Sequence, residues 1–176
     1  PFSVTQGCFR CVHWNCRGLV MWEAAKRVKA LSYLSRIARN RHILCLSEVH
    51  GLPSEVLVEL RSILPNWKFW YSPCFDAEGR LDPARGGVLF LVCPDLCKAA
   101  THIEHVVYAH GRAHRLEITI NHNNKPGEIP DLRILRAYNI HNHGLSASMV
   151  RNIGYNINES TQQDILDPKK STTFVA

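Results

Sequence analysis

A change of hydrophobic period in the first part of the chain most restricts what it can fold into. Residues 9–16 alternate apolar and polar side chains, as a strand does, and Arg17 and Gly18 end the pattern. From residue 22 to 40 the apolar positions follow helical spacing. Ile43-Leu-Cys-Leu-Ser47 is then a short apolar run typical of a buried strand. Strand, helix and strand in this order predict the start of a mixed α/β fold.

The rest of the sequence continues this pattern with more closely spaced strands. A second helix is expected over residues 55–63, with Ser54 as its cap, and a weaker helical pattern covers residues 146–165. Further strands are expected at residues 67–71, 86–93, 105–109, 115–120 and 132–140, with a loop at 75–85. No linker divides the chain, so we expect an upstream tail over residues 1–8 and one domain over residues 9–176.

Composition places the chain among ordinary globular domains. Hydrophobic residues make up 45% and charged residues 20% of 176 residues, which excludes the disordered and disulfide-framework classes. No apolar run approaches the roughly 18 residues of a membrane span, and residues 1–7 show no secretory signal. The seven cysteines, several of them inside apolar runs, suit a reduced chain. We therefore expect an intracellular protein, nuclear or cytoplasmic, with no membrane contact and no obligate protein partner readable from the sequence.

The positive charge is concentrated near the start of the chain. The formal net charge is +6, and residues 1–51 hold eight basic and two acidic side chains, whereas residues 52–176 hold thirteen of each. A local basic excess attracts polyanions through long-range attraction and counterion release. An ordinary solvated helix face explains the same pattern equally well.

Polar residues follow the first two strands at the points where each strand ends. Asn15 closes the first strand and Glu48 follows the second. The carboxyl ends of strands in open α/β sheets are where ligands bind, and hard oxygen ligands of this kind suit Mg²⁺ or Mn²⁺. In the alternative reading, Asn15 caps a turn and Glu48 is a solvated strand terminus.

A third polar segment, Asn139-Ile-His-Asn-His-Gly-Leu145, follows the apolar strand at 132–140. A histidine at a strand end can donate a hydrogen bond to a phosphate oxygen, or shuttle a proton near neutral pH. His141 is the candidate for this role. The alternative is a histidine that only satisfies a backbone group of its own loop.

Four segments together resemble a known group of enzymes. They are His13-Trp-Asn-Cys-Arg-Gly-Leu19, Leu46-Ser-Glu-Val-His50, Gly86-Gly-Val-Leu-Phe90 and Asn139-Ile-His141. In this order they resemble the endonuclease/exonuclease/phosphatase superfamily, which includes DNase I and the apurinic/apyrimidinic endonucleases. The first two are most similar to the endonuclease domain of non-LTR retrotransposons. The resemblance implies a DNase I-like four-layer α/β sandwich that hydrolyses phosphodiesters, such as DNA, with Mg²⁺ or Mn²⁺.

The resemblance also assigns roles to individual residues. Glu48 would be the main metal-binding carboxylate, and Asn15 would support the metal and the phosphate. His141 would hydrogen-bond the scissile phosphate and stabilise its developing charge. Residues that the resemblance places against the substrate phosphate are Arg85, Arg112 and Asn142. Asn142 and His143 stand where many members of the superfamily carry Ala-Pro, so this loop departs from the usual pattern.

Two further motifs of the superfamily, Gly-Asp-x-Asn and Ser-Asp-His, do not occur in this sequence. They supply the Asp that activates water and an Asp-His pair. We therefore expect a domain cut before its last strands, and a chain that is inactive alone because one member of the catalytic unit is missing. The alternatives are a non-catalytic nucleic-acid-binding relic and another phosphoesterase of the same superfamily. A zinc module is disfavoured because Cys8 and Cys11, on an extended segment, point to opposite faces.

Overall fold

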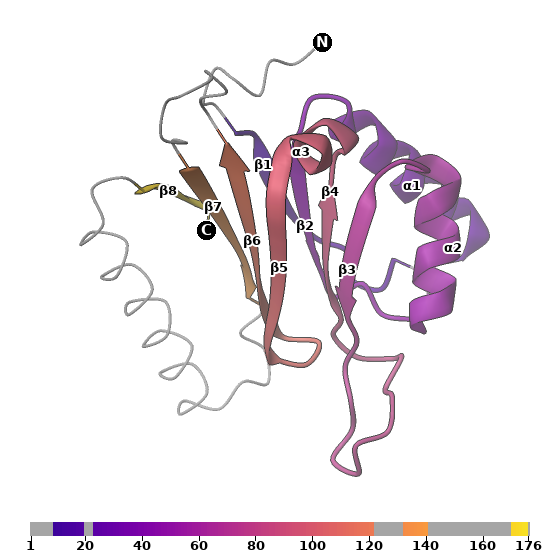
Figure 1. Cartoon of the computed structure of the whole chain (residues 1–176). Coiled ribbons are helices and arrows are strands. Elements are labelled where there is room, and N and C mark those ends of the chain that lie inside the picture. Colours follow the sequence, from indigo (N-terminus) through magenta and orange to yellow (C-terminus); the bar gives the residue numbers. More distant parts are fainter. Residues whose placement is uncertain (1–8, 20–22, 122–131, 141–169, 176) are drawn as a thin grey trace, which may run out of the picture.

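The computed structural model describes residues 9–19, 23–121, 132–140 and 170–175, which contain three helices and eight strands (Figure 1). The helices are α1 (Ala24–Ala38), α2 (Pro53–Ile63) and α3 (Pro94–Ala99). The strands are β1 (Cys11–Asn15), β2 (Ile43–Ser47), β3 (Lys68–Ser72), β4 (Val88–Val92), β5 (Ala100–Ala109), β6 (Ala113–Asn121), β7 (Leu132–Ile140) and β8 (Lys170–Val175).

The strands form two four-stranded sheets. The first sheet has the order β1-β2-β4-β3, with β1 parallel to β2 and with β4 antiparallel to both of its neighbours. The second has the order β5-β6-β7-β8, in which only β7 and β8 run parallel. Helix α1 is the crossover that a parallel β1–β2 pair requires. It follows that β1, β2 and β3 all end at the same edge of the first sheet.

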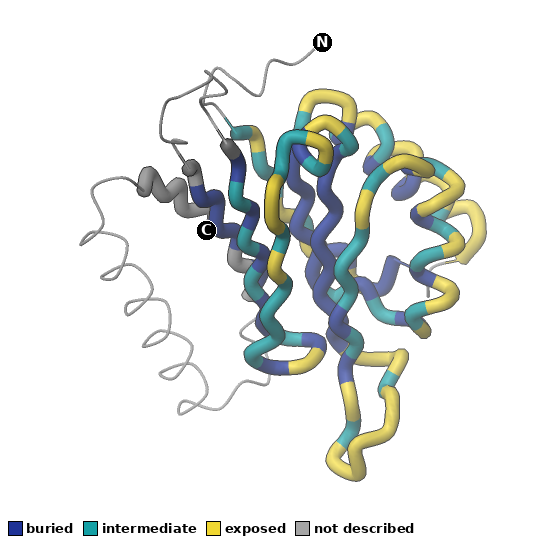
Figure 2. The backbone as a smooth tube through the Cα atoms, viewed as in Figure 1, coloured by how far each residue is buried: buried dark blue, intermediate teal, exposed yellow. Residues whose placement is uncertain are grey.

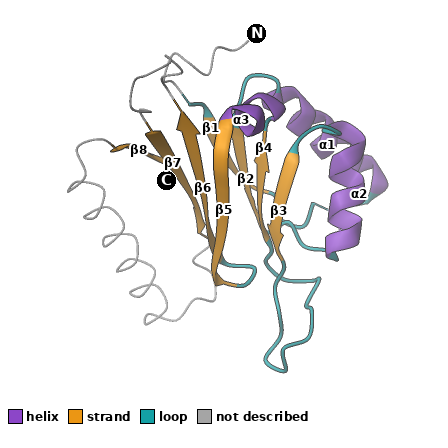
Figure 3. Ribbon diagram, in the orientation of Figure 1, coloured by secondary structure: helices purple, strands orange, loops and turns teal. Residues whose placement is uncertain are grey.

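The described elements make three layers, with helices α1 and α2 over one face of the first sheet and the second sheet over the other (Figure 3). Successive side chains of β2 point alternately to the two faces of the sheet. Leu44 and Leu46 pack with the helices, and Ile43 and Cys45 pack with the second sheet. Strand β4 does the same, so both central strands are buried throughout (Figure 2). Burial on both faces explains why these two strands are continuous apolar runs in the sequence.

The helix starts differ from the sequence expectation. Helix α2 begins at Pro53, and Glu55 Oε2 accepts a hydrogen bond from the Leu52 backbone N–H at 3.0 Å, so Ser54 is not the cap. Proline fits the first helical position because its missing N–H would be unpaired there anyway. Helix α3 was not expected. It has six residues, too few for a periodic pattern, and the Cys93 sulfur accepts from the Leu96 N–H at 3.4 Å at its start.

The predicted mixed α/β fold with two facing sheets and outer helices is confirmed. The helix expected at 146–165 lies outside the described residues, so the layers observed are three. None of the described helices is both long and apolar enough to cross a membrane.

Candidate functional site

The candidate site lies at one edge of the sandwich, which we call the site edge. It comprises residues 15–18, 48–51, 73–87 and 109–112 together with the carboxyl end of β7. Backbone hydrogen bonds join these segments: Val49 N–H donates to Gly87 O at 3.1 Å, and Gly87 N–H donates to Gly111 O at 3.0 Å. Both sheets therefore contribute to this edge.

Asn15 and Glu48 stand side by side at the site edge. Asn15 is the register partner of Ser47, so Glu48 lies one residue beyond it on the neighbouring parallel strand. The Gly18 N–H donates to Glu48 O at 2.6 Å and fixes the chain after β1 against the chain after β2. Asn15 is exposed and Glu48 is half-buried, so solvent reaches both side chains. Their roles as metal and phosphate ligands remain predictions.

Asn15 also makes the contact that the turn-capping alternative requires. Its Oδ1 accepts a hydrogen bond from the Arg17 backbone N–H at 3.0 Å, which is an Asx turn. An amide oxygen has two lone pairs, so this bond leaves one acceptor site on Oδ1. The turn holds the side chain in place without preventing a second interaction.

The backbone at the site edge adopts conformations that side chains disfavour. Arg17, Glu48 and His50 all have positive φ, at 49°, 50° and 55°. Among the described residues these are the non-glycine positions with positive φ, and every described glycine with positive φ also lies within the segments of this edge. Such conformations cost of order 1–3 kcal/mol each and concentrate at functional sites. The left-handed turn at Glu48 redirects its side chain as the strand ends.

His50 belongs to the site and was missed by the sequence prediction, although it stands two residues after Glu48. Burial lowers the pKa of its imidazole, and Arg112 lowers it further, while the carboxylates of Glu48 and Asp82 oppose the shift. His50 is thus within electrostatic reach of groups from three different segments. No sequence signal places Asp82 or Arg112 beside it, because both come from separate turns.

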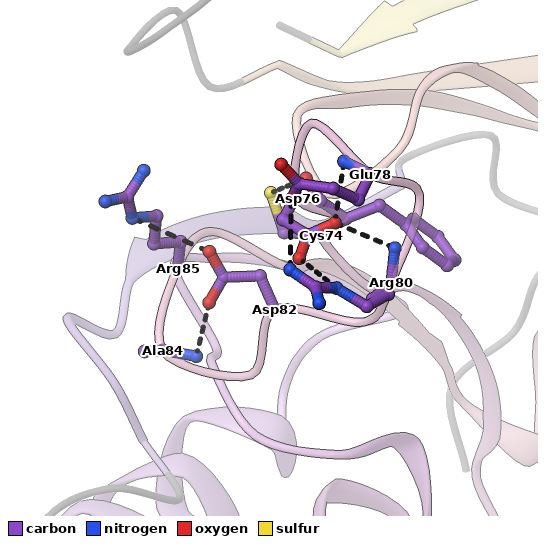
Figure 4. A network of polar contacts seen from close by, with 8 residues as sticks. Cys74, Asp76, Glu78, Arg80, Asp82, Ala84 and Arg85 are labelled. Atoms are coloured by element: carbon purple, nitrogen blue, oxygen red, sulfur yellow. Dashed lines mark hydrogen bonds and ion pairs between the residues drawn. The ribbon is translucent and has the colours of Figure 1, made fainter.

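Arg112 and Arg85, the two described candidates for phosphate contact, both lie at this edge. The Arg112 guanidinium carbon packs against Gly86, since a Cβ placed on that glycine would lie 3.4 Å from it. Arg85 is exposed and its Nε lies 3.6 Å from Asp82 Oδ2, in a loop that Asp82 also stabilises by accepting from the Ala84 N–H (Figure 4). Arg112 also acts electrostatically on His50, whereas Arg85 lies close to Asp82 in its own loop.

The outer part of the loop 73–87 has its own network. Asp76 Oδ1 accepts from the backbone N–H groups of Glu78 and Arg80, and Asp76 Oδ2 accepts from Arg80 Nε at 2.9 Å (Figure 4). These bonds lower the pKa of Asp76, the Arg80 backbone contact most strongly. The carboxylate of Asp76 is thus committed to its loop and is a poor candidate for a metal ligand.

A buried amide joins the two sheets just behind the site edge. The Asn139 Nδ2 donates to Leu46 O at 2.8 Å and to Leu89 O at 3.2 Å, which are register partners in β2 and β4. Asn139 is 1% exposed. Leu46 precedes Glu48 by two residues and Asn139 precedes His141 by two, so this clamp fixes both strands where they approach the site.

Behind the same edge, several buried polar atoms have no hydrogen-bond partner among the described residues. They include Ser47 Oγ, His114 Nε2 and Asn139 Oδ1. His114 is opposite Asn139 in the β6–β7 register and stacks on Phe90 with ring centroids 4.1 Å apart. Its Nδ1 is 2.9 Å from His105 Nε2. Burial, and secondarily His105, lowers the pKa of His114 well below its ordinary value, so it is neutral in the folded protein.

His141 and Asn142 lie outside the described residues. Ile140, the residue before them, is opposite Ala113 at the site edge. Within the described part of the chain, no three His, Cys, Asp or Glu side chains are grouped as a metal site. One carboxylate and one amide oxygen fit Mg²⁺, because this ion keeps several waters and binds proteins through one or two carboxylates together with substrate phosphates.

Comparison with known proteins shows relatives at the level of the fold. No protein-family model matches the sequence, and no curated protein sequence matches it. Several solved structures are similar, among them three of TDP2. Danio rerio TDP2 complexed with single strand DNA product has a TM-score of 0.53 at 12% identity, and covers 94% of this chain and 58% of its own. Truncated Caenorhabditis elegans TDP2 has a TM-score of 0.54 at 10% identity, covering 94% and 60%.

The third structure is a humanized Danio rerio TDP2 with 14 mutations, with a TM-score of 0.51 at 10% identity, covering 94% of this chain and 60% of its own. The chain therefore spans about 60% of the length of these solved chains. The similarity concerns the fold, which is the DNase I-like pair of facing sheets with outer helices.

Proposed function

We propose that this chain is part of a divalent-metal-dependent phosphodiester hydrolase acting on nucleic acid, of the type found in non-LTR retrotransposons. The observation that carries the proposal is the position of Glu48 and Asn15 at the carboxyl ends of adjacent parallel strands. The order of the motifs around them, in a DNase I-like fold, supports the same function. Because the chain spans about 60% of its solved relatives, the activity is proposed for the whole protein.

In this proposal Glu48 and Asn15 hold Mg²⁺, which when bound supplies Lewis-acid polarisation of a phosphoryl oxygen. Arg112 binds the phosphate of the same nucleotide from the other sheet, and it is suited to this because a guanidinium matches phosphate geometry. The charges of Glu48, Asp82 and Arg112 all act on His50. Because its pKa is lowered, it is neutral near pH 7 and can donate one hydrogen bond to a phosphate oxygen without repelling the metal.

A second function has a specific observation in its favour. Among the described residues no three His, Cys, Asp or Glu side chains are grouped as a metal site, and the sequence lacks the Gly-Asp-x-Asn and Ser-Asp-His motifs. A domain that binds nucleic acid and a metal without cleaving would have this composition. The two functions share the site and differ in whether a water is activated.

A metal titration tests the shared site. Mn²⁺ binding, followed by the electron paramagnetic resonance signal of the free ion, is expected to weaken more than roughly ten-fold in Glu48→Gln. Glu104→Gln is the matched control, because Glu104 lies within β5 and pairs with Arg115 at 3.2 Å, away from the site edge. Equal weakening in both variants, or in neither, would overturn the metal site.

A nicking assay separates the two functions. Supercoiled DNA with Mg²⁺ is expected to stay intact with residues 1–176 alone, and to be nicked by a longer protein that adds the two missing motifs. Nicking by residues 1–176 that disappears in Glu48→Gln would establish the hydrolase but contradict the expected inactivity. A longer protein that binds Mn²⁺ and DNA without nicking would favour the binding function.

A further inference from the structure

We propose that the exposed face of α1 binds a single-stranded nucleic acid as it leaves the candidate site. The α1 face is defined by Val28, Lys29, Ser32, Tyr33 and Arg36, which line a shallow depression of about 370 Å³. The inference rests on the proposed function, because it assigns a path to the substrate of that site. Single-stranded nucleic acid is the partner because its recognition combines cationic side chains with aromatic rings.

The spacing of these residues produces one continuous stripe. Lys29, Tyr33 and Arg36 stand at i, i+4 and i+7, which places them on one side of a helix. The opposite side of α1 is buried against the first sheet through Leu31 and Leu34. Lys29, Tyr33 and Arg36 are all exposed, and Figure 2 colours much of α1 as exposed.

Charge distinguishes this face from its neighbour. Helix α1 carries four basic side chains and no acidic one, whereas α2, on the same face of the same sheet, carries two glutamates and one arginine. Arg27 of α1 is neutralised by Glu59 of α2, with 3.2 Å between Nε and Oε1. Lys29 makes no ion pair with any described residue. The Arg36 guanidinium lies over the Tyr33 ring and likewise makes no ion pair with a described residue. Lys29 and Arg36, the α1 cations without an acidic partner among the described residues, both lie on the stripe.

The aromatic ring of the stripe is held in a fixed orientation. Tyr33 is 44% exposed, and its ring meets the Trp14 ring edge to face at 5.7 Å between centroids. The Arg36 guanidinium carbon lies 5.3 Å from the centre of the Tyr33 ring. A guanidinium and a phenol ordered in this way offer a flat surface for a base and a charge for its phosphate.

The Tyr33 ring of the stripe contacts β1 one residue before Asn15 of the candidate site. Trp14, which contacts Tyr33, is the residue immediately before Asn15 in β1. A strand whose phosphate lies at Asn15 and Glu48 would therefore meet the α1 face within a few nucleotides. A duplex is a poorer fit, because its bases are stacked on each other and cannot stack on Tyr33.

Fluorescence anisotropy with labelled oligothymidine in the presence of a chelator tests the surface without involving the metal. The double variant Lys29→Glu/Arg36→Glu is expected to bind more than roughly ten-fold more weakly than the wild type. The matched control is Arg61→Glu/Lys98→Glu, which changes the net charge equally at exposed positions on α2 and α3. Loss of affinity within two-fold of the control would overturn the proposal.

A measurement on the wild-type protein keeps the test independent of variant folding. In the wild-type protein, oligothymidine is expected to shift the amide NMR signals of α1 and not those of α2, and the reverse pattern would overturn the proposal. The log–log salt dependence of binding should flatten by about 0.7 for each phosphate contact removed in the double variant. Tyr33→Ala is expected to weaken binding to single strands, with Tyr33→Phe restoring it. Tyr33→Ala binding as wild type would overturn the stacking role.

This test fails separately from that of the proposed function. The Lys29→Glu/Arg36→Glu variant should still bind Mn²⁺ at the site edge, because neither side chain is among the residues proposed to hold the metal. If Glu48→Gln binds Mn²⁺ as well as the wild type does, while the double variant still loses oligothymidine affinity, the metal site is overturned and the α1 surface is kept. If Glu48→Gln loses Mn²⁺ binding, while the double variant binds oligothymidine as its control does, the metal site is kept and the α1 surface is overturned.

Discussion

The two edges of the sandwich are built from the same strands but differ in backbone strain and in how completely their polar groups are hydrogen-bonded. At the edge away from the site, formed by residues 39–42, 64–67 and 93–99, connections are tight and none of these residues has positive φ. His42 there accepts from the Arg10 N–H at 3.0 Å through Nδ1, and its carbonyl accepts from the Cys93 N–H at 2.9 Å. At the site edge, Arg17, Glu48 and His50 have positive φ, and buried polar atoms behind it have no hydrogen-bond partner among the described residues.

This difference shows where destabilising features are located in the fold. Backbone strain and unpaired buried polar atoms each cost free energy, and a fold retains them where the surrounding structure enforces them. Here they gather on one edge, where the charges of Glu48 and Arg112 act on the His50 imidazole. We infer that the site edge is shaped for binding and that the opposite edge is shaped for stability.

The largest effect is expected at a glycine that closes the site edge. Gly111 has φ of 64°, and a Cβ added there would lie 2.6 Å from Cys74 Cα. Gly111→Ala should lower the free energy of unfolding by roughly 3 kcal/mol, from backbone strain and overlap together. Gly79→Ala is the control, because Gly79 has φ of 77° but open space around it, and should cost only about 1 kcal/mol. Urea denaturation measures both, and equal losses would contradict the account of close packing.

The sequence predicted the elements better than the contacts between them. Strand β2 was predicted with its observed ends, Ile43 and Ser47, because burial on both faces leaves an uninterrupted apolar run. Glu48 could be placed at a strand end for the same reason, and Asn15 because the alternating pattern of residues 9–16 ends at Arg17 and Gly18. Helix α3 and the start of α2 were missed because short helices and proline-led starts leave little periodic signal.

Other parts of the site depend on tertiary contacts that a single sequence does not encode locally. His50 joins the site through Asp82 and Arg112, which are 32 and 62 residues further along the chain. In the sequence, Asn139 is a polar residue near the end of an apolar strand. Only the packing of the two sheets shows that its amide hydrogen-bonds to the backbone of β2 and β4. His141, predicted from the resemblance, stays a prediction.

A smaller effect is expected from removing the clamp between the sheets. Asn139→Ala should cost about 2 kcal/mol of unfolding free energy, because two buried hydrogen bonds are lost. Asn139→Asp should cost at least as much although it is nearly isosteric, since a carboxylate cannot donate to the Leu46 and Leu89 carbonyls. Chemical denaturation compares the three proteins. A cost of Asn139→Asp well below that of Asn139→Ala would show that the amide acts by filling space rather than by donating.

The smallest expected effect concerns pH. His114 has a folded-state pKa well below the ordinary value of 6.5, so protons bind the unfolded chain more readily. Its contribution to stability is therefore complete above pH 6.5 and is lost as the pH falls below that value. His114→Phe should reduce the acid loss of stability while keeping the stacking on Phe90. Denaturation midpoints at neutral and mildly acidic pH measure this, and an unchanged pH dependence in the variant would contradict it.

The central claim is that the site edge, and not the opposite edge, binds a divalent metal through Glu48. Paramagnetic broadening of amide NMR signals by substoichiometric Mn²⁺ tests it most directly, because it maps the ion without requiring catalysis. The account predicts broadening of residues 15–18 and 48–51, no broadening of residues 39–42 and 93–96, and loss of the effect in Glu48→Gln. Broadening centred on the loop 76–80 or on the opposite edge, or broadening that persists in Glu48→Gln, would contradict it.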